Sequence, residues 1–223
     1  MKLLSLVTAI SALALGAAVD RTPLFDFYKG IEKSKIVLAI NCGSDTPITD
    51  DDGVTYEADK YFDGGVMSSE GANHRWMAPN TDIYHSERWA KDKKMTYKLP
   101  ISSTGTFTLI LKFSEVYFEQ LGEKVFDVYL GTTPLLLRLD ILSRAGAKML
   151  PHDEFFEFEI KRGHGGIKEV YFQGSLVNKA YTDDGELKIE FRRGSADNPK
   201  INSINIVKGD KSNTHFENWM NYK

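Results

Sequence analysis

The sequence contains a single cysteine, Cys42, and no Asn-x-Ser/Thr sequon. One cysteine cannot form a disulfide within the chain, so the fold must be stabilised by its hydrophobic core. We interpret Cys42 as a small buried hydrophobic residue rather than as a reactive thiol. Without a sequon, the chain is not an acceptor for N-linked glycans by that motif.

The sequence also lacks an excess of charge of either sign. Its 28 Lys and Arg residues nearly balance its 31 Asp and Glu residues, which gives a net charge of -3. This balance offers no basic face to nucleic acid and no polybasic run to anionic lipid, so we expect neither partner. The apolar fraction of 42% is ordinary for a globular protein, and the length allows one sizeable β domain or two small ones.

The only long hydrophobic run is at the N-terminus. Residues 1–18 contain one early lysine, then apolar and small residues, which is typical of a secretory signal peptide cleaved near Ala17 or Ala18. A buried helix or a membrane anchor is the alternative, but the run is short for a transmembrane segment. The chain ends in "WMNYK", without a retrieval signal of the Lys-Asp-Glu-Leu type. We therefore expect a soluble protein of the endoplasmic reticulum lumen, or a secreted one.

The remaining chain has a β pattern from residue 35 to residue 209. Residues 19–34 are predicted to be a linker or edge segment, and residues 210–223 a C-terminal tail. Short runs that alternate apolar and polar residues, without helical periods between them, predict an all-β antiparallel β-sandwich. The predicted strands are residues 35–40, 107–113, 125–130, 155–160, 187–191 and 201–207.

Residues 59–95 do not fit this pattern, because they are polar and weakly periodic yet rich in aromatic residues. A long segment of this kind is usually functional or disordered, and its aromatic content argues against disorder. We expect it to contribute to a functional site.

No catalytic or metal-binding motif stands out. "HDE" at 152–154 lacks a second spaced histidine, so we interpret Asp153 as a loop residue that caps backbone amides. "GHGG" at 163–166 lacks the following lysine of a phosphate loop and is predicted to be a hairpin turn. Carboxylates are so frequent that a pair for glycoside hydrolysis has no predictive value. We expect no metal, no cofactor and no catalytic residue.

The stretch "SEVYFEQ" at 114–120 contains two adjacent aromatic residues, Tyr117 and Phe118. On a strand they would point to opposite faces, so at least one must meet solvent. Aromatic rings beside a carboxylate suit a sugar, whose C–H face lies on a ring while its hydroxyls need directed acceptors. From these residues alone, packing in the core or in a loop remains the alternative.

The chain resembles the malectin domain over roughly residues 35–209. The resemblance is carried by "INCGSD", "DGVTYEADKYFDGG", "DIYHSERW", "LILKFSEVYFEQLGEKVFDVYLG", "LDILSRAGAKMLPHDEFFEFEI" and "GELKIEFRRGSADNPKINSINIVKG". It implies a jelly-roll-like, galactose-binding-like β-sandwich that acts as a lectin rather than an enzyme. It also implies glucose-containing oligosaccharides as ligands, among them α-linked diglucosides and glucosylated N-glycans in glycoprotein quality control, and a membrane-bound partner from the glycosylation machinery.

The resemblance further implies a sugar site of four aromatic residues and an aspartate on loops at one end of the sandwich. The fourth aromatic, a tyrosine after the Gly-Gly pair, has no clean counterpart, and either Trp76 or His74 stands in its place. The residues that match the family's site are Tyr84, Tyr117, Phe118 and Asp197.

For two of these residues, a purely structural role is the alternative to sugar binding. Tyr84 can pack under Trp89, and Asp197 can begin the "DNP" turn, for which Asp is well suited. Two rival functions also remain open at this point: a protein-interaction module that has lost sugar binding, and an accessory module of a glycan-processing enzyme.

Overall fold

The computed structural model describes residues 33–76 and 81–209. The predicted signal peptide, most of the predicted linker and the predicted tail lie outside these residues. Within the two described ranges, no helix is both long and apolar enough to cross a membrane.

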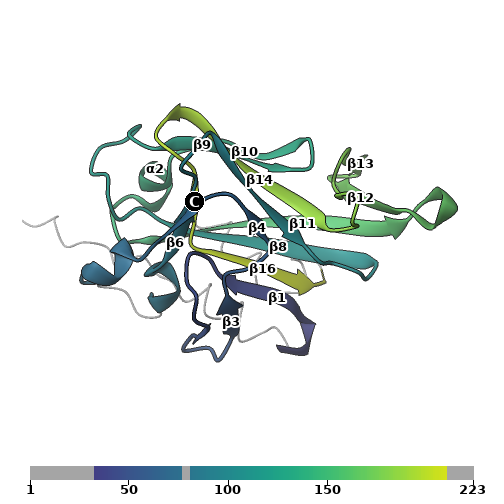
Figure 1. Cartoon of the computed structure of the whole chain (residues 1–223), viewed down its shortest axis with the longest axis horizontal. Coiled ribbons are helices and arrows are strands. Elements are labelled where there is room, and N and C mark those ends of the chain that lie inside the picture. The colour runs from purple at the N-terminus through teal and green to yellow at the C-terminus, as the bar shows by residue number, and fades with distance from the viewer. Residues whose placement is uncertain (1–32, 77–80, 210–223) are drawn as a thin grey trace, which may run out of the picture.

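The fold is the predicted all-β sandwich, in which a large sheet packs on a smaller one (Figure 1). The strand order is β13-β12-β11-β8-β16-β1-β3-β2 in the eight-stranded sheet and β10-β9-β14-β7-β4 in the five-stranded sheet. A third small sheet has the order β15-β6-β5. The strands pair antiparallel, except that β1 and β3 run parallel.

The eight-stranded sheet consists of β1 (Ile36–Asn41), β2 (Ile48–Thr49), β3 (Thr55–Ala58), β8 (Gly105–Ser114), β11 (Pro151–Arg162), β12 (Lys168–Phe172), β13 (Ser175–Leu176) and β16 (Ser203–Lys208). The five-stranded sheet consists of β4 (Phe62–Asp63), β7 (Lys94–Leu99), β9 (Val125–Leu130), β10 (Thr133–Leu139) and β14 (Leu187–Ala196). The small sheet consists of β5 (Val66–Ser68), β6 (Glu87–Trp89) and β15 (Lys200–Ile201). The helical elements are η1 (Lys33–Lys35), η2 (Glu70–Asn73), η3 (Asp82–Tyr84), α2 (Ile141–Ala145) and η4 (His164–Gly166).

Strand β8 is the central strand of the fold and is buried on both faces. Its predicted inward residues, such as Phe107 and Phe113, are fully buried in the main core between the two large sheets. The opposite face is covered by a second hydrophobic cluster, which includes Ile110 and Tyr84. Because Lys112 points to this covered face, its ammonium group is buried and needs a partner.

A short helix, α2, was not predicted and shapes one end of the sandwich. The Asp140 side chain accepts a hydrogen bond from Ser143 N at the start of this helix, and Gly146 closes it with a positive φ of 85°. The second oxygen of Asp140 accepts a hydrogen bond from Gly122 N, at 2.7 Å. The helix therefore anchors the loop that joins β8 to β9 at the left end of the molecule in Figure 1.

Two sequence predictions about β11 have different outcomes. The "GHGG" segment is the predicted hairpin turn, because β11 and β12 pair antiparallel on either side of it. The loop predicted at Asp153 is wrong, because this residue lies within β11 and its carboxylate binds Lys112 and Tyr84 rather than backbone amides.

Candidate functional site

The chain leaves β8 at Ser114 and crosses the end of the sandwich before it enters β9 at Val125. The Glu115 side chain organises this exit. Its Oε1 accepts hydrogen bonds from Tyr117 N at 2.8 Å and from Phe118 N at 3.0 Å. Glu115 is only 1% exposed, and no described residue hydrogen-bonds to its Oε2. A buried carboxylate thus fixes the backbone that presents the two adjacent aromatic residues.

Tyr117 and Phe118 form an edge-to-face pair. Their ring centroids are 5.1 Å apart and their planes meet at 79°. Tyr117 is 72% exposed, whereas Phe118 is half-buried. Because β8 has already ended, the strand rule does not apply to these neighbours, and both rings lie at the same end of the fold.

Strand register brings Asp197 to this ring pair. Ala196 at the end of β14 pairs with Val125 at the start of β9, so the next residues outward, Asp197 and Lys124, face each other. The register shifts just before this point, and Gly194 makes the shift possible, because a Cβ there would lie 2.5 Å from the Val125 carbonyl oxygen. The φ of Asp197 is 50°, a left-handed conformation that Asp adopts more readily than most residues.

Lys124 joins Asp197 to Phe118. Its ammonium group forms an ion pair with Asp197 Oδ2 and donates a hydrogen bond to the Asn198 carbonyl oxygen at 3.1 Å. The same nitrogen lies 5.3 Å from the centroid of the Phe118 ring, within cation–π range. Together these residues form one unit, which we call the rim cluster and which consists of Tyr117, Phe118, Lys124 and Asp197.

Tyr84 lies beside the exit from β8 but outside the rim cluster: Asn202 donates a hydrogen bond to its carbonyl oxygen at 3.1 Å and accepts one from Ser114 N at 2.9 Å. Tyr84 is 4% exposed and belongs to the second hydrophobic cluster, on the covered face of β8. It packs on Trp76, with ring centroids 6.3 Å apart, rather than under Trp89 as its structural alternative supposed. Its hydroxyl donates to Asp153 Oδ1 at 2.7 Å. In this conformation Tyr84 offers almost no surface to a ligand.

Trp76 is half-buried, and its indole N–H donates to the Gly71 carbonyl oxygen at 2.8 Å. Its only donor is therefore in use. His74, the other residue considered for the missing tyrosine, is half-buried, with its Nε2 3.6 Å from Glu70 Oε1. Between described residues, no ring contact joins Trp76 or Tyr84 to the rim cluster.

A buried ion pair holds the Tyr84 hydroxyl. Lys112 Nζ lies 2.6 Å from Asp153 Oδ2, on the covered face of the sheet. Burial alone would lower the pKa of Lys112, but the charge and hydrogen bond of Asp153, together with Tyr84 and Tyr56, outweigh burial and raise the pKa well above its ordinary value. We call this group the covered cluster, and it consists of Trp76, Tyr84, Lys112 and Asp153.

The sequence did not indicate Lys124 and Glu115 as site residues. The role of Glu115 has a local sequence signal, because the two amides that donate hydrogen bonds to it belong to residues only two and three positions further along the chain. Lys124 has none, because its partner Asp197 is 73 residues away in the chain. Only the pairing of β9 with β14 makes them neighbours.

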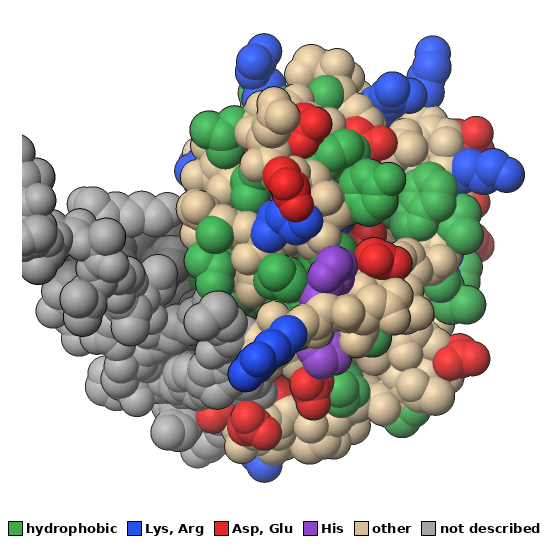
Figure 2. Space-filling model, turned by 90° about the vertical axis from the view of Figure 1, so that its left-hand side faces the viewer, with side chains coloured by type: hydrophobic (Ala, Val, Ile, Leu, Met, Phe, Trp, Pro, Cys, Tyr) green, Lys and Arg blue, Asp and Glu red, His purple; other side chains and the backbone are tan. Residues whose placement is uncertain are grey.

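Figure 2 faces the left-hand end of the molecule in Figure 1, where α2 lies. Hydrophobic side chains lie among carboxylates there rather than in one continuous apolar patch. The exposed large hydrophobic residues in the loop between β8 and β9 are Tyr117 and Leu121. Such a mixed surface suits a polar ligand with apolar faces better than a large apolar partner.

The malectin domain family model matches residues 36–204, which include every strand from β1 to β15 and the whole rim cluster. The chain belongs to the malectin-domain family. It is 34% identical over 180 residues to Malectin from Danio rerio, covering 78% of this chain and 59% of the relative. It is 32% identical over 179 residues to Malectin from Homo sapiens, covering 78% of this chain and 57% of the relative. The chain thus spans about three fifths of the length of these relatives.

Solved structures share the malectin-like fold at low identity. The ANXUR2 extracellular domain from Arabidopsis thaliana superposes with a TM-score of 0.62 at 18% identity, covering 80% of this chain and 50% of that one. A Bacteroides uniformis β-glucuronidase superposes with a TM-score of 0.55 at 16% identity, covering 82% of this chain and 19% of that one. These likenesses concern the fold alone.

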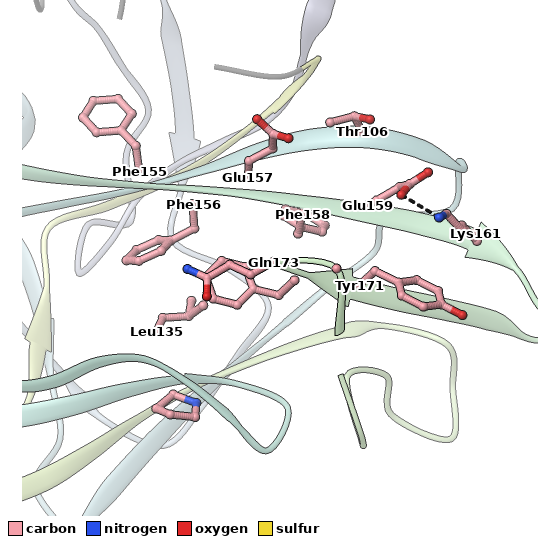
Figure 3. Close-up of a pocket in the computed structure, with 13 residues that line it drawn as sticks. Thr106, Leu135, Phe155, Phe156, Glu157, Phe158, Glu159, Lys161, Tyr171 and Gln173 are labelled. Atoms are coloured by element: carbon pink, nitrogen blue, oxygen red, sulfur yellow. Dashed lines mark ion pairs between the residues drawn. The ribbon is translucent and has the colours of Figure 1, made fainter. Parts of the chain in front are cut away.

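The malectin domain also has a cleft that no residue of the rim cluster lines. This half-open cleft of about 640 Å³ lies where β11 and β12 pass β10 (Figure 3). Phe156 and Leu135 point into it from opposite walls, with Gln173 between them. Phe156 and Leu135 also pack on the main core, so this part of the cleft is a margin of the core.

Proposed function

We propose that this malectin-domain protein is a lectin whose binding site is the rim cluster. Its proposed ligands are glucose-containing oligosaccharides, with α-linked diglucosides and glucosylated N-glycans as the preferred class. The observation that carries the proposal is the exposed Tyr117–Phe118 ring pair beside the partly exposed carboxylate of Asp197.

The chemistry of this arrangement suits a sugar. The Tyr117 ring is open to solvent and offers a flat surface for the C–H face of a pyranose. Asp197 accepts hydroxyl hydrogens close by, and a bond to a charged acceptor is stronger than one between neutral groups. The expected mechanism is reversible binding, without catalysis and without a metal. Each ring contributes about 0.5–1.5 kcal/mol beyond area burial, so we expect modest affinity.

Tyr84 and Trp76 have a lesser place in the proposal. The resemblance to the family implies Tyr84 as a sugar contact and leaves Trp76 or His74 in place of the fourth aromatic, yet Tyr84 is buried and the N–H of Trp76 is already bonded. Tyr84 would contact a ligand only if the covered cluster opened. We therefore propose that Tyr117, Phe118 and Asp197 make the first contacts with the sugar.

The cellular role follows from the same proposal. An N-terminal segment typical of a signal peptide supports action in the endoplasmic reticulum lumen or outside the cell. Binding of glucosylated N-glycans there would serve glycoprotein quality control, with a membrane-bound component of the glycosylation machinery as partner. Imaging a tagged full-length chain against markers of the endoplasmic reticulum tests this part.

The binding proposal is tested by a glycan array followed by calorimetric titration with maltose and nigerose. Wild-type protein should bind an α-glucosyl ligand, and Tyr117→Ala should weaken binding roughly two- to tenfold, as expected for one lost stacking ring. Tyr171→Ala is the matched control, because Tyr171 is an aromatic residue that lines the cleft of Figure 3. If Tyr171→Ala abolishes binding and Tyr117→Ala does not, the sugar binds in the cleft and the rim proposal is wrong.

The main rival is a protein-interaction module that kept the fold and lost the sugar site. The burial of Tyr84 favours it, since one wall of the implied site is closed. Absence of binding to every α-glucosyl ligand at millimolar concentration would support this rival.

A further inference from the structure

The ammonium group of Lys124 is fully engaged inside the rim cluster. One side faces Asp197 Oδ2, another the Asn198 carbonyl oxygen, and a third the Phe118 ring. Lys124 is also buried, whereas Asp197 is partly exposed. Any effect of Lys124 on a ligand is therefore indirect and acts through Asp197 and Phe118.

The two oxygens of Asp197 are not equivalent. Oδ2 is held by Lys124, while no residue in the described ranges donates a hydrogen bond to Oδ1. The carboxylate cannot rotate without breaking the ion pair, and the strand register that opposes Ala196 to Val125 fixes the positions of both backbones. Asp197 thus offers one oriented acceptor oxygen instead of two interchangeable ones.

We propose that Lys124 is a positioning and specificity-determining residue, which holds Asp197 so that Oδ1 alone accepts one particular hydroxyl of the sugar. This inference rests on the proposed function. A free carboxylate would rotate to accept hydroxyls in several directions, whereas an acceptor fixed beside the Phe118 ring selects a sugar by the position of one hydroxyl. Lys124 gives the site geometric selectivity without touching the ligand.

The test uses nigerose and its monodeoxy analogues, each of which lacks one hydroxyl, titrated by calorimetry into the full chain. With wild-type protein, one analogue should bind about tenfold to a hundredfold more weakly than nigerose, because it lacks the partner of a charged acceptor. Asp197→Asn identifies that hydroxyl, since this variant should bind that analogue and nigerose nearly equally.

Lys124→Arg is the decisive variant, because it keeps the positive charge beside Asp197. A guanidinium tends to bind both carboxylate oxygens, so Oδ1 would no longer be available to the sugar. We expect the preference for that one hydroxyl to fall below about threefold, while the preferences at the other hydroxyls stay as in wild type. Lys124→Met frees the carboxylate to rotate and should reduce the same preference.

The outcomes are separable. If Lys124→Arg keeps the wild-type preference at every hydroxyl, or weakens all analogues by one common factor, Lys124 is merely structural and the inference is overturned. Melting temperatures verify that each variant is folded, and Lys124→Arg decides alone if Lys124→Met does not fold. If wild-type protein binds neither nigerose nor maltose, the proposed function fails as well. Normal wild-type binding with an unchanged preference in Lys124→Arg overturns this inference only.

Discussion

The rim cluster and the covered cluster are built from the same parts and differ in what surrounds them. Each combines two large aromatic side chains with a lysine–aspartate ion pair. In the covered cluster the side chains of Lys112 and Asp153 are 5% and 0% exposed, while those of Lys124 and Asp197 are 9% and 32% exposed. Two differences stand out: one carboxylate reaches solvent, and Tyr117 is 72% exposed while Tyr84 is 4% exposed.

These differences assign separate tasks to the two clusters. Asp153 uses both oxygens inside the protein, one for Lys112 and one for the Tyr84 hydroxyl. Asp197 uses one oxygen for Lys124, and no described residue donates a hydrogen bond to the other. Under the proposed function, a Lys–Asp pair beside aromatic rings stabilises the fold in one place and binds sugar in the other, and variants at matched positions should separate these roles.

The largest expected effect is on stability, at the covered cluster. Asp153→Ala removes the carboxylate that pairs with the buried Lys112 ammonium and accepts the hydrogen bond from the Tyr84 hydroxyl. Removing one member of a buried ion pair typically destabilises a protein by about 3–5 kcal/mol. Urea denaturation should show a loss of this size in the free energy of unfolding.

Asp197→Ala is the matched variant. It should lower the free energy of unfolding by only about 1 kcal/mol, because a partly exposed pair is screened by solvent, and it should abolish sugar binding. An equal loss of stability in the two variants would contradict the distinction between the clusters.

Much of the β-sandwich was predictable from alternation. The run predicted at residues 125–130 matches β9 (Val125–Leu130) at both ends, because buried and half-buried residues alternate from Phe126 onward. The edge strand β10 was not predicted. Its sequence, "TPLLLRL", has proline in second place, and its apolar residues do not alternate with polar ones. Its pairing with β9 shifts register twice. Edge strands with bulges give no two-residue period to recognise.

The site was predictable only where the signal was local. Adjacency alone indicated that Tyr117 or Phe118 must meet solvent, and Tyr117 does. The sequence did not show that Tyr84 is covered, because its burial depends on Lys112 and Asp153, which come from other strands. The pairing of strands that are distant in the sequence decides which aromatic side chain is exposed and which is buried. No local sequence pattern indicates that pairing.

The second prediction concerns the support of the rim cluster. Glu115→Ala removes the acceptor for the Tyr117 and Phe118 amides, so the loop should lose its fixed geometry. An unsatisfied buried amide costs about 1–3 kcal/mol. We expect a loss of stability in that range together with a loss of sugar affinity. Glu115→Gln keeps one acceptor oxygen and should retain most of both; if it behaves like the alanine variant, charge rather than the hydrogen bonds supports the loop.

The third prediction concerns one hydroxyl in the covered cluster. Tyr84→Phe keeps the ring packed on Trp76 and removes the hydrogen bond to Asp153. The free energy of unfolding should fall by about 0.5–1.5 kcal/mol, the usual contribution of one hydrogen bond. Nigerose affinity should not change, because the hydroxyl faces the interior. A weakened affinity in a fully folded Tyr84→Phe protein would show that the covered cluster opens to bind sugar.

The smallest effect on stability and affinity is expected for a Tyr→Phe substitution in the rim cluster. Tyr117→Phe leaves the exposed ring in place, and no described residue hydrogen-bonds to its hydroxyl, so stability should stay within about 0.5 kcal/mol of wild type. If Tyr117 acts by stacking alone, nigerose affinity should stay within about twofold. A tenfold loss would instead mean that the hydroxyl binds the sugar, and Tyr117 would then share with Asp197 the task of selecting a hydroxyl. The two Tyr→Phe variants, measured side by side, therefore compare one lost hydroxyl inside the fold with one lost hydroxyl at the site.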